Sequence, residues 1–500
     1  MALISIITEL GENSEARSEQ VSSLLPLKCA DVDFHFVSQL PNVPKNDAQN
    51  IRENITAITP GIIHGSHLEA INSSTSEILI FIGKNHSLCA DAIDRITKIV
   101  ALQPEISVWY ATQVRVAHSS NAQNSVKLPH FSPERLLGDN YLRSGIIARR
   151  SAVMNAMSQL QELDQSALYE LSLRLIHVFP LVGHLRAPVY VQHGFDEVGE
   201  DGDVIEKSEC EVVRRELNRR NVDAEVVTNQ TGSRRVLRKI FRDPLVSIVI
   251  PTGCQTRRLG ENNVLLVDQC VNSIVNNSTY SNYEIVIIQD QTKTISDELL
   301  QWSNNQQIRI IPYSKEFNFA DKCNVGFVQS KGDFVIFLND DTTVLSPDWI
   351  ETLIGHLQDV GVGLVGPTLL FEDGRVQSAS LCNNPAPHNY GSGQSTEEFS
   401  ALPHNRIARE VSGVTGACMA IRRDVYSEIG GMSTEFPNNF NDIDLCFKLL
   451  YKRYRIIWTP FAQLTHFEAQ TRDPNVTEFE SRLLRSRWGR FFNNDKFTPA

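Results

Sequence analysis

The segment Phe334–Thr342 reads FVIFLNDDT, five apolar residues followed at once by an amide and two acids. A short, continuous apolar run is typical of a strand buried on both faces of a sheet. Asp340 and Asp341 would then stand at the carboxyl end of the strand, where open α/β sheets bind their ligands. Because carboxylate oxygens suit hard divalent cations, the segment predicts an α/β core with a cation-binding edge.

A second segment, Ile78–His86, reads ILIFIGKNH and repeats the apolar strand without the acids. Strand-like runs alternate with helical patterns around both segments, as in α/β proteins. Further along, Leu171–Leu175 (LSLRL) resembles Leu445–Leu449 (LCFKL). Alternation alone is shared by any two α/β domains, but the matching positions favour a duplication. The chain is therefore predicted to hold two tandem domains with mostly parallel sheets flanked by helices.

Length and charge suggest the domain boundaries. Five hundred residues are enough for two or three domains that each bury a core. We expect a first domain at 1–200, a charge-rich linker with some structure of its own at 201–243, and a second domain at 244–500. The first domain lacks the acids and is predicted to be degenerate and non-catalytic.

Composition argues against several classes of protein. The formal net charge of −12 disfavours a nucleic-acid partner, because phosphate contacts need basic surfaces. No run approaches the roughly 20 apolar residues of a membrane-spanning helix. The start, Met1–Thr8, lacks a basic leader and indicates a first strand rather than a signal peptide. Nine scattered cysteines without a Cys-x-x-Cys pair are typical of reduced thiols. We expect a cytoplasmic protein.

Acidic residues cluster at three places in the second half. They are Asp290, the Asn339-Asp340-Asp341 group, and Asp442 with Asp444. A single Asp after a strand is usually a turn former or a helix cap. Three such groups brought together would repel one another, and a divalent cation would relieve the repulsion.

Several blocks of the second half resemble family 2 glycosyltransferases. They are VSIVIPT at 246–252, GDFVIFLNDDT at 332–342, GVTGA at 413–417, NNFNDIDL at 438–445, WTP at 458–460 and HFE at 466–468. The similarity covers about residues 244–490, with the motifs in the order typical of the family. It implies the GT-A fold and an inverting enzyme that transfers a hexosyl or deoxyhexosyl group from a nucleotide-diphosphate donor. It also implies a role in assembling bacterial surface polysaccharide, such as the O-antigen of lipopolysaccharide.

The resemblance gives the residues of the donor site their roles. Pro251, Thr252 and Asp290 would line the nucleoside pocket, with Asp290 accepting hydrogen bonds from the base or ribose. Asn339 stands at the first position of the family's Asp-x-Asp motif, where the family prefers an acid. Asp340 would contact the ribose or the sugar of the donor.

The resemblance also implies a bound Mn²⁺ or Mg²⁺. Asp341 would be its principal ligand, with Asn339 contributing more weakly. His466 matches a metal-ligand histidine of the family, although imidazole is a less usual partner of hard cations and a hydrogen-bonded core histidine is the alternative. In the first half His193 echoes His466, while the acids are absent.

Asp442 matches the general base of the family, which takes a proton from the acceptor hydroxyl. On a helix, Asp442 and Asp444 lie about 200° apart, on opposite flanks of an apolar face. Asp444 also precedes Lys448 by four residues, the spacing of a surface ion pair. We therefore predict that Asp442 is the base and that Asp444 is structural. Leu168 falls at the position of Asp442 in the first half.

The expected partners are a nucleotide-diphosphate sugar and a glycan or lipid-linked oligosaccharide acceptor, with residues 382–404 on the acceptor side. Aromatic and arginine residues interleave over 479–492 in a predicted C-terminal amphipathic helix. Such a helix either rests on an anionic membrane, here the inner face of the plasma membrane, or packs on its own domain. We expect packing, because apolar helical faces are usually core. No sequence pattern sets the oligomeric state.

Two other functions fit parts of the sequence. A non-catalytic glycan-binding or scaffold protein, with both halves degenerate, would account for Asn339 and for the run Gln289-Asp290-Gln291. A sugar nucleotidyltransferase usually has a glycine-rich loop with Arg or Lys after its first strand, and residues 251–258 (PTGCQTRR) are a poor version. Hydrolysis of nucleotide sugars in the presence of Mn²⁺ separates the enzyme from the scaffold.

Overall fold

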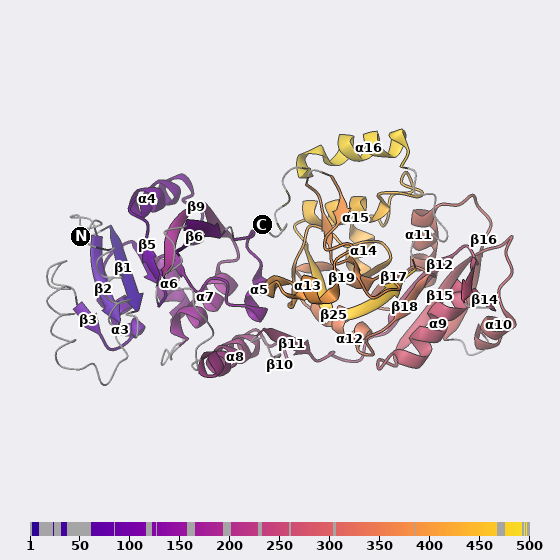
Figure 1. The fold of residues 1–500 in the computed structure, drawn as a ribbon, viewed down its shortest axis with the longest axis horizontal. Helices are drawn as coiled ribbons and strands as arrows, with labels where there is room; N and C mark the ends of the chain where they lie inside the picture. The colour runs from indigo at the N-terminus through magenta and orange to yellow at the C-terminus, as the bar shows by residue number, and fades with distance from the viewer. Residues whose placement is uncertain are drawn as a thin grey trace. The chain divides into compact units, whose positions relative to one another are not determined.

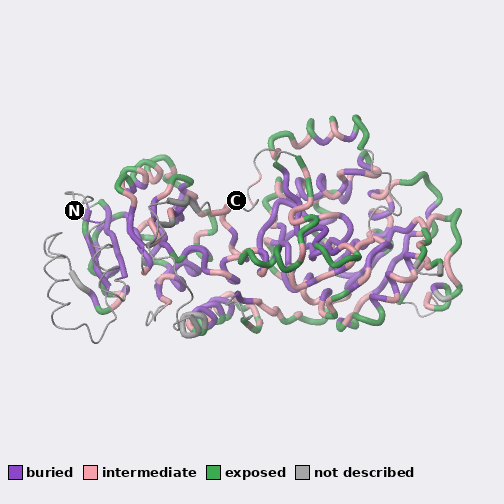
Figure 2. The backbone as a smooth tube through the Cα atoms, viewed as in Figure 1, coloured by how far each residue is buried: buried purple, intermediate pink, exposed green. Residues whose placement is uncertain are grey.

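The computed structural model describes residues 3–9, 24, 32–37, 62–84, 86–116, 123–126, 128–157, 166–193, 202–228, 233–259, 262–303, 307–384, 386–467, 476–492, 495 and 497. The chain divides into two compact units. The first comprises Met1–Val222 with Thr228–Gly232 and Ala500, and the second comprises Asp223–Val227 with Ser233–Pro499. Each unit has its own sheet, helices and buried strands (Figures 1 and 2).

The sheet of the second unit is parallel in one half and mixed in the other. Its strand order is β16-β15-β12-β17-β24-β19-β25-β18. The parallel strands are β16 (Ile308–Tyr313), β15 (Tyr283–Asp290), β12 (Val246–Thr252) and β17 (Phe334–Leu338). The other strands are β24 (Cys418–Arg422), β19 (Val362–Leu370), β25 (Arg455–His466) and β18 (Thr342–Val344), with β20 (Val376–Ser378) and β23 (Arg409–Glu410) pairing at the side.

The first unit repeats the order of the eight main strands, as β3-β2-β1-β4-β8-β6-β9-β5. Its strands are β3 (Ile62–His64), β2 (Val32–Val37), β1 (Ile4–Glu9), β4 (Ile78–Ile82), β8 (Gly145–Arg149), β6 (Val108–Val116), β9 (Val182–His193), β5 (His86–Leu88) and, paired with β6, β7 (Gln123–Val126). The predicted class, two tandem α/β domains, is confirmed. The sequence predicts mostly parallel sheets. In each unit antiparallel pairing begins at the far side of β4 or β17, which pair with β8 and β24.

Strand register identifies equivalent residues in the two units. After β17, Thr342 pairs with His466, and after β4, His86 pairs with Gln192. The position of His466 is therefore held by Gln192 in the first unit. His193, which the sequence analysis matches to His466, lies one residue further along β9 than Gln192.

Helices complete both units. In the second unit they are α9 (Leu266–Asn277), α10 (Asp297–Ser303), α11 (Phe319–Gln329), α12 (Trp349–Leu357), α13 (Thr396–Ser400), α14 (Arg423–Glu428), α15 (Asn441–Tyr451) and α16 (Glu478–Trp488). In the first unit they are α3 (His67–Ser73), α4 (Ala92–Leu102), α5 (Pro133–Gly138), α6 (Arg150–Met157), α7 (Ala167–Val178) and α8 (Gly202–Arg219).

The core of the second unit lies on both faces of its sheet, because successive strand residues point to opposite faces. Ile248 and Ile336 belong to one buried cluster, whereas Val249 and Phe337 belong to the other. α11 approaches β12 closely: a Cβ added at Gly326 would lie 2.2 Å from Cγ1 of Val249. Only glycine fits at this contact, which brings α11 against the strand that ends at the site.

The predicted linker, residues 201–243, contains regular structure. α8 belongs to the first unit, whereas β10 (Ala224–Thr228) and β11 (Arg234–Arg238) form a two-stranded sheet that lies largely in the second unit. Arg235 of β11 forms an ion pair with Asp348 beside α12.

The C-terminal helix packs on its own unit, as the sequence analysis expects. Leu484 of α16 joins a buried cluster with Ile443 and Phe447 of α15, and α16 lies over α15 in Figure 1. No helix in the described ranges is long and apolar enough to cross a membrane. The eight cysteines that the structure describes are free thiols.

Candidate active site

A cavity of about 400 Å³ opens at the carboxyl ends of β12, β15 and β17. All eight residues predicted for the site line it: Pro251, Thr252, Asp290, Asn339, Asp340, Asp341, Asp442 and His466. They come from the ends of β12 and β15, the turn after β17, the first turn of α15 and the end of β25. The sheet and α15 together therefore assemble side chains that lie far apart in the sequence.

Asp290 stands on the side of the cavity formed by β12 and β15. Its Oδ1 accepts hydrogen bonds from the backbone N–H of Thr292 at 3.0 Å and from the Thr292 hydroxyl at 2.8 Å. These bonds hold the pKa of Asp290 below its usual range. Asp290 is thus an oriented carboxylate, suited to accept hydrogen bonds from hydroxyl or N–H groups of a ligand.

Asp340 is buried beside a second acid. Its side chain is only 4% exposed, and its Oδ2 accepts a hydrogen bond of 2.6 Å from the Thr252 hydroxyl. Burial and the neighbouring Asp341 raise the pKa of Asp340 to about 6. Positive charge in the cavity would favour the ionised form of this group.

Lys322, which the sequence analysis missed, supplies a buried cation. It lies on α11 with 2% of its surface exposed, and its Nζ donates a 2.9 Å hydrogen bond to the carbonyl oxygen of Thr252. The ammonium also lies over the rings of Tyr313 and Phe317, at 5.3 and 5.5 Å from their centroids. Burial lowers the pKa of Lys322, and nearby acids act in the opposite direction. No local motif marks this lysine, because it reaches the site through helix packing.

Asn339, Asp341 and His466 meet at the turn after β17. The Nε2 atom of His466 lies 3.1 Å from Oδ1 of Asp341 and 3.3 Å from Nδ2 of Asn339. Oδ1 of Asp341 and Oδ1 of Asn339 are buried, and neither makes a hydrogen bond within the described part of the chain. The Nδ2–H group of Asn339 donates to Nε2 of His466, whereas the two buried oxygens have no hydrogen-bond partner in the described ranges.

Gln377, a second residue that the sequence analysis missed, orients the histidine. The Nδ1–H group of His466 donates to Oε1 of Gln377 at 2.6 Å, and Nε2–H of Gln377 donates to the carbonyl oxygen of His466 at 3.1 Å. Because an amide oxygen only accepts, Nδ1 carries the proton and the lone pair is on Nε2. This arrangement is typical of metal-binding histidines.

These three residues fit a divalent cation that also binds phosphate and water. Across the described ranges, no three or more His, Cys, Asp or Glu gather as a metal centre. Asp341 and His466 could provide two such ligands, and Asn339 a weaker third. Mg²⁺ is usually held by one or two carboxylates together with substrate phosphates and water, so the residues present match a shared site rather than a closed structural one.

Asp442 faces the cavity from the start of α15. Its Oδ2 accepts a hydrogen bond of 2.9 Å from the N–H of Gly416, and its Oδ1 accepts one of 2.8 Å from the N–H of Ile443. Asp444 lies outside the cavity and is fully buried. It is 3.4 Å from Nζ of Lys448, so the predicted ion pair is present but is buried rather than on the surface.

Comparison with known proteins assigns this unit to a family. Residues 261–430, within the second unit, match the model of glycosyl transferase family 2. The second unit contains a family 2 glycosyltransferase domain. The turn after β17 and the segment 413–417 lie inside the match, whereas Asp442 and His466 lie beyond its end.

Relatives of the glycosyltransferase domain extend over the first unit as well. An uncharacterised protein of Sinorhizobium fredii is 25% identical over 437 residues, which are 81% of this chain and 46% of that protein. The O-antigen biosynthesis protein RfbC of Myxococcus xanthus is 24% identical over 489 residues, 94% of this chain and 38% of that protein. This chain thus spans less than half the length of either relative. A solved structure, GalNAc-T7 with UDP, GalNAc and Mn²⁺, has a TM-score of 0.38 and 15% identity over 48% of each chain.

Proposed function

We propose that the second unit is a metal-dependent, inverting glycosyltransferase that moves a hexosyl or deoxyhexosyl group from a nucleotide-diphosphate sugar to a glycan or lipid-linked acceptor. The observation that carries the proposal is that donor, metal and base candidates from separate chain segments line one cavity. The family match and a relative named for O-antigen biosynthesis support the enzyme class and a role in bacterial surface polysaccharide synthesis.

On the donor side, Pro251, Thr252 and Asp290 bind the nucleoside. Asp341 and His466, with Asn339, would hold Mn²⁺ or Mg²⁺. When bound, the cation neutralises the negative charge that grows on the leaving nucleoside diphosphate.

On the acceptor side, Asp442 takes the proton from the attacking hydroxyl, a contribution of about 10²–10⁴ in rate. The hydroxyl oxygen forms a bond to the anomeric carbon as the bond to the diphosphate breaks on the opposite face, and the diphosphate leaves with the electron pair. Asp442 is oriented for this by the N–H groups of Gly416 and Ile443, which hold one carboxylate oxygen each.

We further propose that the first unit is non-catalytic. Lys84 stands where the second unit has Asp340, and its Nζ lies 3.4 Å from Oε1 of Glu9. In the first unit, Lys84 paired with Glu9 thus replaces the carboxylate that lies beside the metal candidates of the second unit. Leu168 likewise takes the place of Asp442.

The replacement Asp442→Asn tests the function. With a panel of UDP- and GDP-sugars and Mn²⁺, release of nucleoside diphosphate should fall by about 10²–10⁴, while calorimetric affinity for UDP or GDP should stay within twofold. Asp373→Asn, at an exposed acid outside the cavity, is the matched control. Wild-type turnover by Asp442→Asn would contradict the base assignment. Nucleotide binding without turnover by the wild type would favour the scaffold alternative, to which Asn339 lends weight.

A further inference from the structure

The helix that carries Asp442 begins at a strained residue. Phe440, the N-cap residue of α15, has φ 61° and ψ 7° and makes no side-chain capping hydrogen bond. A non-glycine residue in the left-handed region costs about 1–3 kcal/mol and persists only where its surroundings fix it. Asp442 follows two residues later, so whatever fixes Phe440 also fixes the base.

Glu480 of α16 holds the chain immediately before Phe440. Its Oε1 accepts a hydrogen bond of 3.0 Å from the backbone N–H of Asn439, and its Oε2 accepts one of 3.3 Å from the Asn439 amide. Asn439 is fully buried and Glu480 is 2% exposed. The same glutamate closes the capping box of α16 with Thr477. The start of α16 is therefore tied to the turn that precedes α15.

Trp488, at the end of α16, holds the chain on the other side of Asp442. Its indole N–H donates a 2.8 Å hydrogen bond to Oδ1 of Asp444, and Nη1 of Arg487 lies 3.5 Å from the same oxygen. Asp444 has no exposed surface. Two anchors on one helix, at Asn439 and Asp444, thus bracket the first turn of α15.

We propose that α16 is a clamp that positions the general base, with Glu480 and Trp488 as positioning residues for Asp442. The inference rests on the proposed function and adds to it a second group of residues on which the transfer step depends. The clamp touches only the base side, because the donor and metal candidates lie at the ends of β12, β15 and β25 and in the turn after β17.

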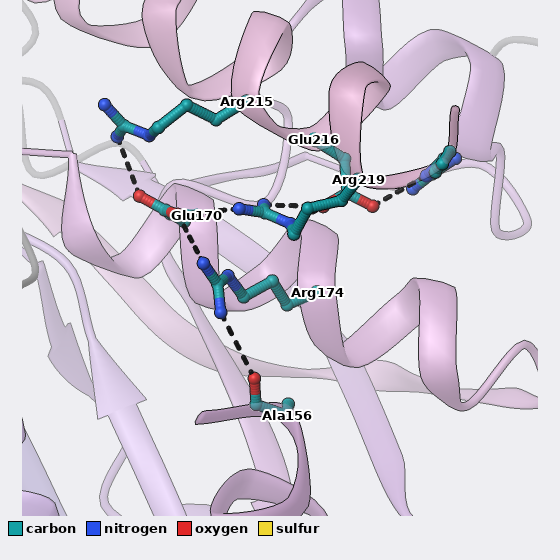
Figure 3. Close-up of polar contacts among 7 residues, drawn as sticks. Ala156, Glu170, Arg174, Arg215, Glu216 and Arg219 are labelled. Carbon is teal, nitrogen blue, oxygen red and sulfur yellow. Dashed lines mark hydrogen bonds and ion pairs between the residues drawn. The ribbon is translucent and has the colours of Figure 1, made fainter. Parts of the chain in front are cut away.

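The first unit ties the acid at the position of Asp444 to its own following helix but has no base, which provides an internal control. Matching Leu171–Leu175 to Leu445–Leu449 makes Glu170 the equivalent of Asp444 and Arg174 the equivalent of Lys448. Figure 3 shows Arg215 and Arg219 of α8 and Arg174 of α7 around Glu170. Arg215 and Arg219 lie 2.7 and 3.1 Å from its carboxylate oxygens. Both units thus tie the acid at this position to the helix that follows the sheet.

The experiment measures the rate of nucleoside diphosphate release and the affinity for nucleotide in variants of the whole chain. For Trp488→Phe, which removes one indole N–H, the rate of nucleoside diphosphate release from the best donor of the UDP- and GDP-sugar panel should fall about 10–100-fold, the effect of roughly 1 Å of misplacement. Affinity for UDP or GDP with Mn²⁺ should not change. Adding Trp488→Phe to Asp442→Asn should cause no further loss, since the two residues act as one unit.

Two further measurements complete the test: amide hydrogen exchange of Trp488→Phe, and the release rate of a variant in the first unit. Trp488→Phe should speed amide exchange in the peptide covering 438–446 and leave 246–252 unchanged, whether or not a donor is known. The variant Glu170→Gln should leave the release rate within twofold of the wild type. The clamp would be overturned by amide exchange in Trp488→Phe at the wild-type rate. It would also be overturned if the losses of release rate in Trp488→Phe and Asp442→Asn were fully additive. If the wild type releases no nucleoside diphosphate while Trp488→Phe still speeds exchange in 438–446, the proposed glycosyltransferase activity is contradicted. The structural contact between α16 and the start of α15 is then still supported.

Discussion

Asp340 should make the metal-free protein less stable at neutral pH than an uncharged residue would. Its pKa rises from 3.8 to about 6 because the carboxyl is buried and stands next to Asp341. The folded state therefore binds a proton more tightly than the unfolded state. Stability falls as the pH rises from about 4 to 6, and the penalty is complete above pH 6. At about 1.4 kcal/mol for each pH unit, the penalty approaches about 3 kcal/mol.

The variant Asp340→Asn tests this sign, because its amide oxygen can still accept the Thr252 hydroxyl while the charge is gone. In EDTA at pH 7 the variant should gain up to about 3 kcal/mol, a rise of about 6–12 °C in the melting temperature of a unit of this size. Tryptophan fluorescence suits the assay, since four of the five tryptophans lie in the second unit.

The pH dependence of the stability gain shows whether the gain comes from removing the charge of Asp340 or from another effect of the Asn side chain. The gain should shrink below pH 6 and vanish below about pH 3, where both states are protonated. The exposed Asp373, whose pKa hydrogen bonds from Arg375 hold below the usual range, should show no gain when replaced by Asn. Equal stability of Asp340→Asn and the wild type at pH 7, or a gain that grows towards acid, would refute the reasoning.

Three further outcomes are expected. Asp341→Ala should weaken UDP or GDP binding in Mn²⁺ at least tenfold and leave binding in EDTA unchanged, as calorimetry can measure; equal loss in both would argue against a ligand role. Gln377→Met should lower Mn²⁺ affinity about 10–100-fold by freeing the His466 ring, a change visible by electron paramagnetic resonance, and unaltered affinity would contradict it. Gly326→Ala should destabilise the second unit by at least 1–3 kcal/mol through collision with Val249, and an unchanged melting temperature would show that α11 can shift.

Residues at strand ends were predictable because local pattern decides them. An apolar run such as 334–338 is a strand wherever it lies, and whatever follows it stands at the edge of the sheet. Asp290 and Asp341 could therefore be expected to meet. The fold class followed in the same way, from alternation of runs rather than from any single contact.

Residues that reach the site through packing were not predictable. Lys322 enters from the buried side of α11, and Gln377 enters from β20, a short strand that pairs beside β19. Asp444 was expected on the surface because its spacing to Lys448 suits an exposed pair, yet α16 covers it. The pattern of one helix does not reveal which later helix will lie over it.

The pairing of β18 with β25 has a consequence for the order in which the protein is made. It joins Thr342 to His466, so the metal candidates Asp341 and His466 cannot meet until the ribosome has passed residue 466. At about 5–20 residues per second, the acids emerge roughly 6–25 s before their histidine. Every strand of the first sheet has been synthesised by residue 193, so the first unit can fold while the reactive centre of the second is still incomplete.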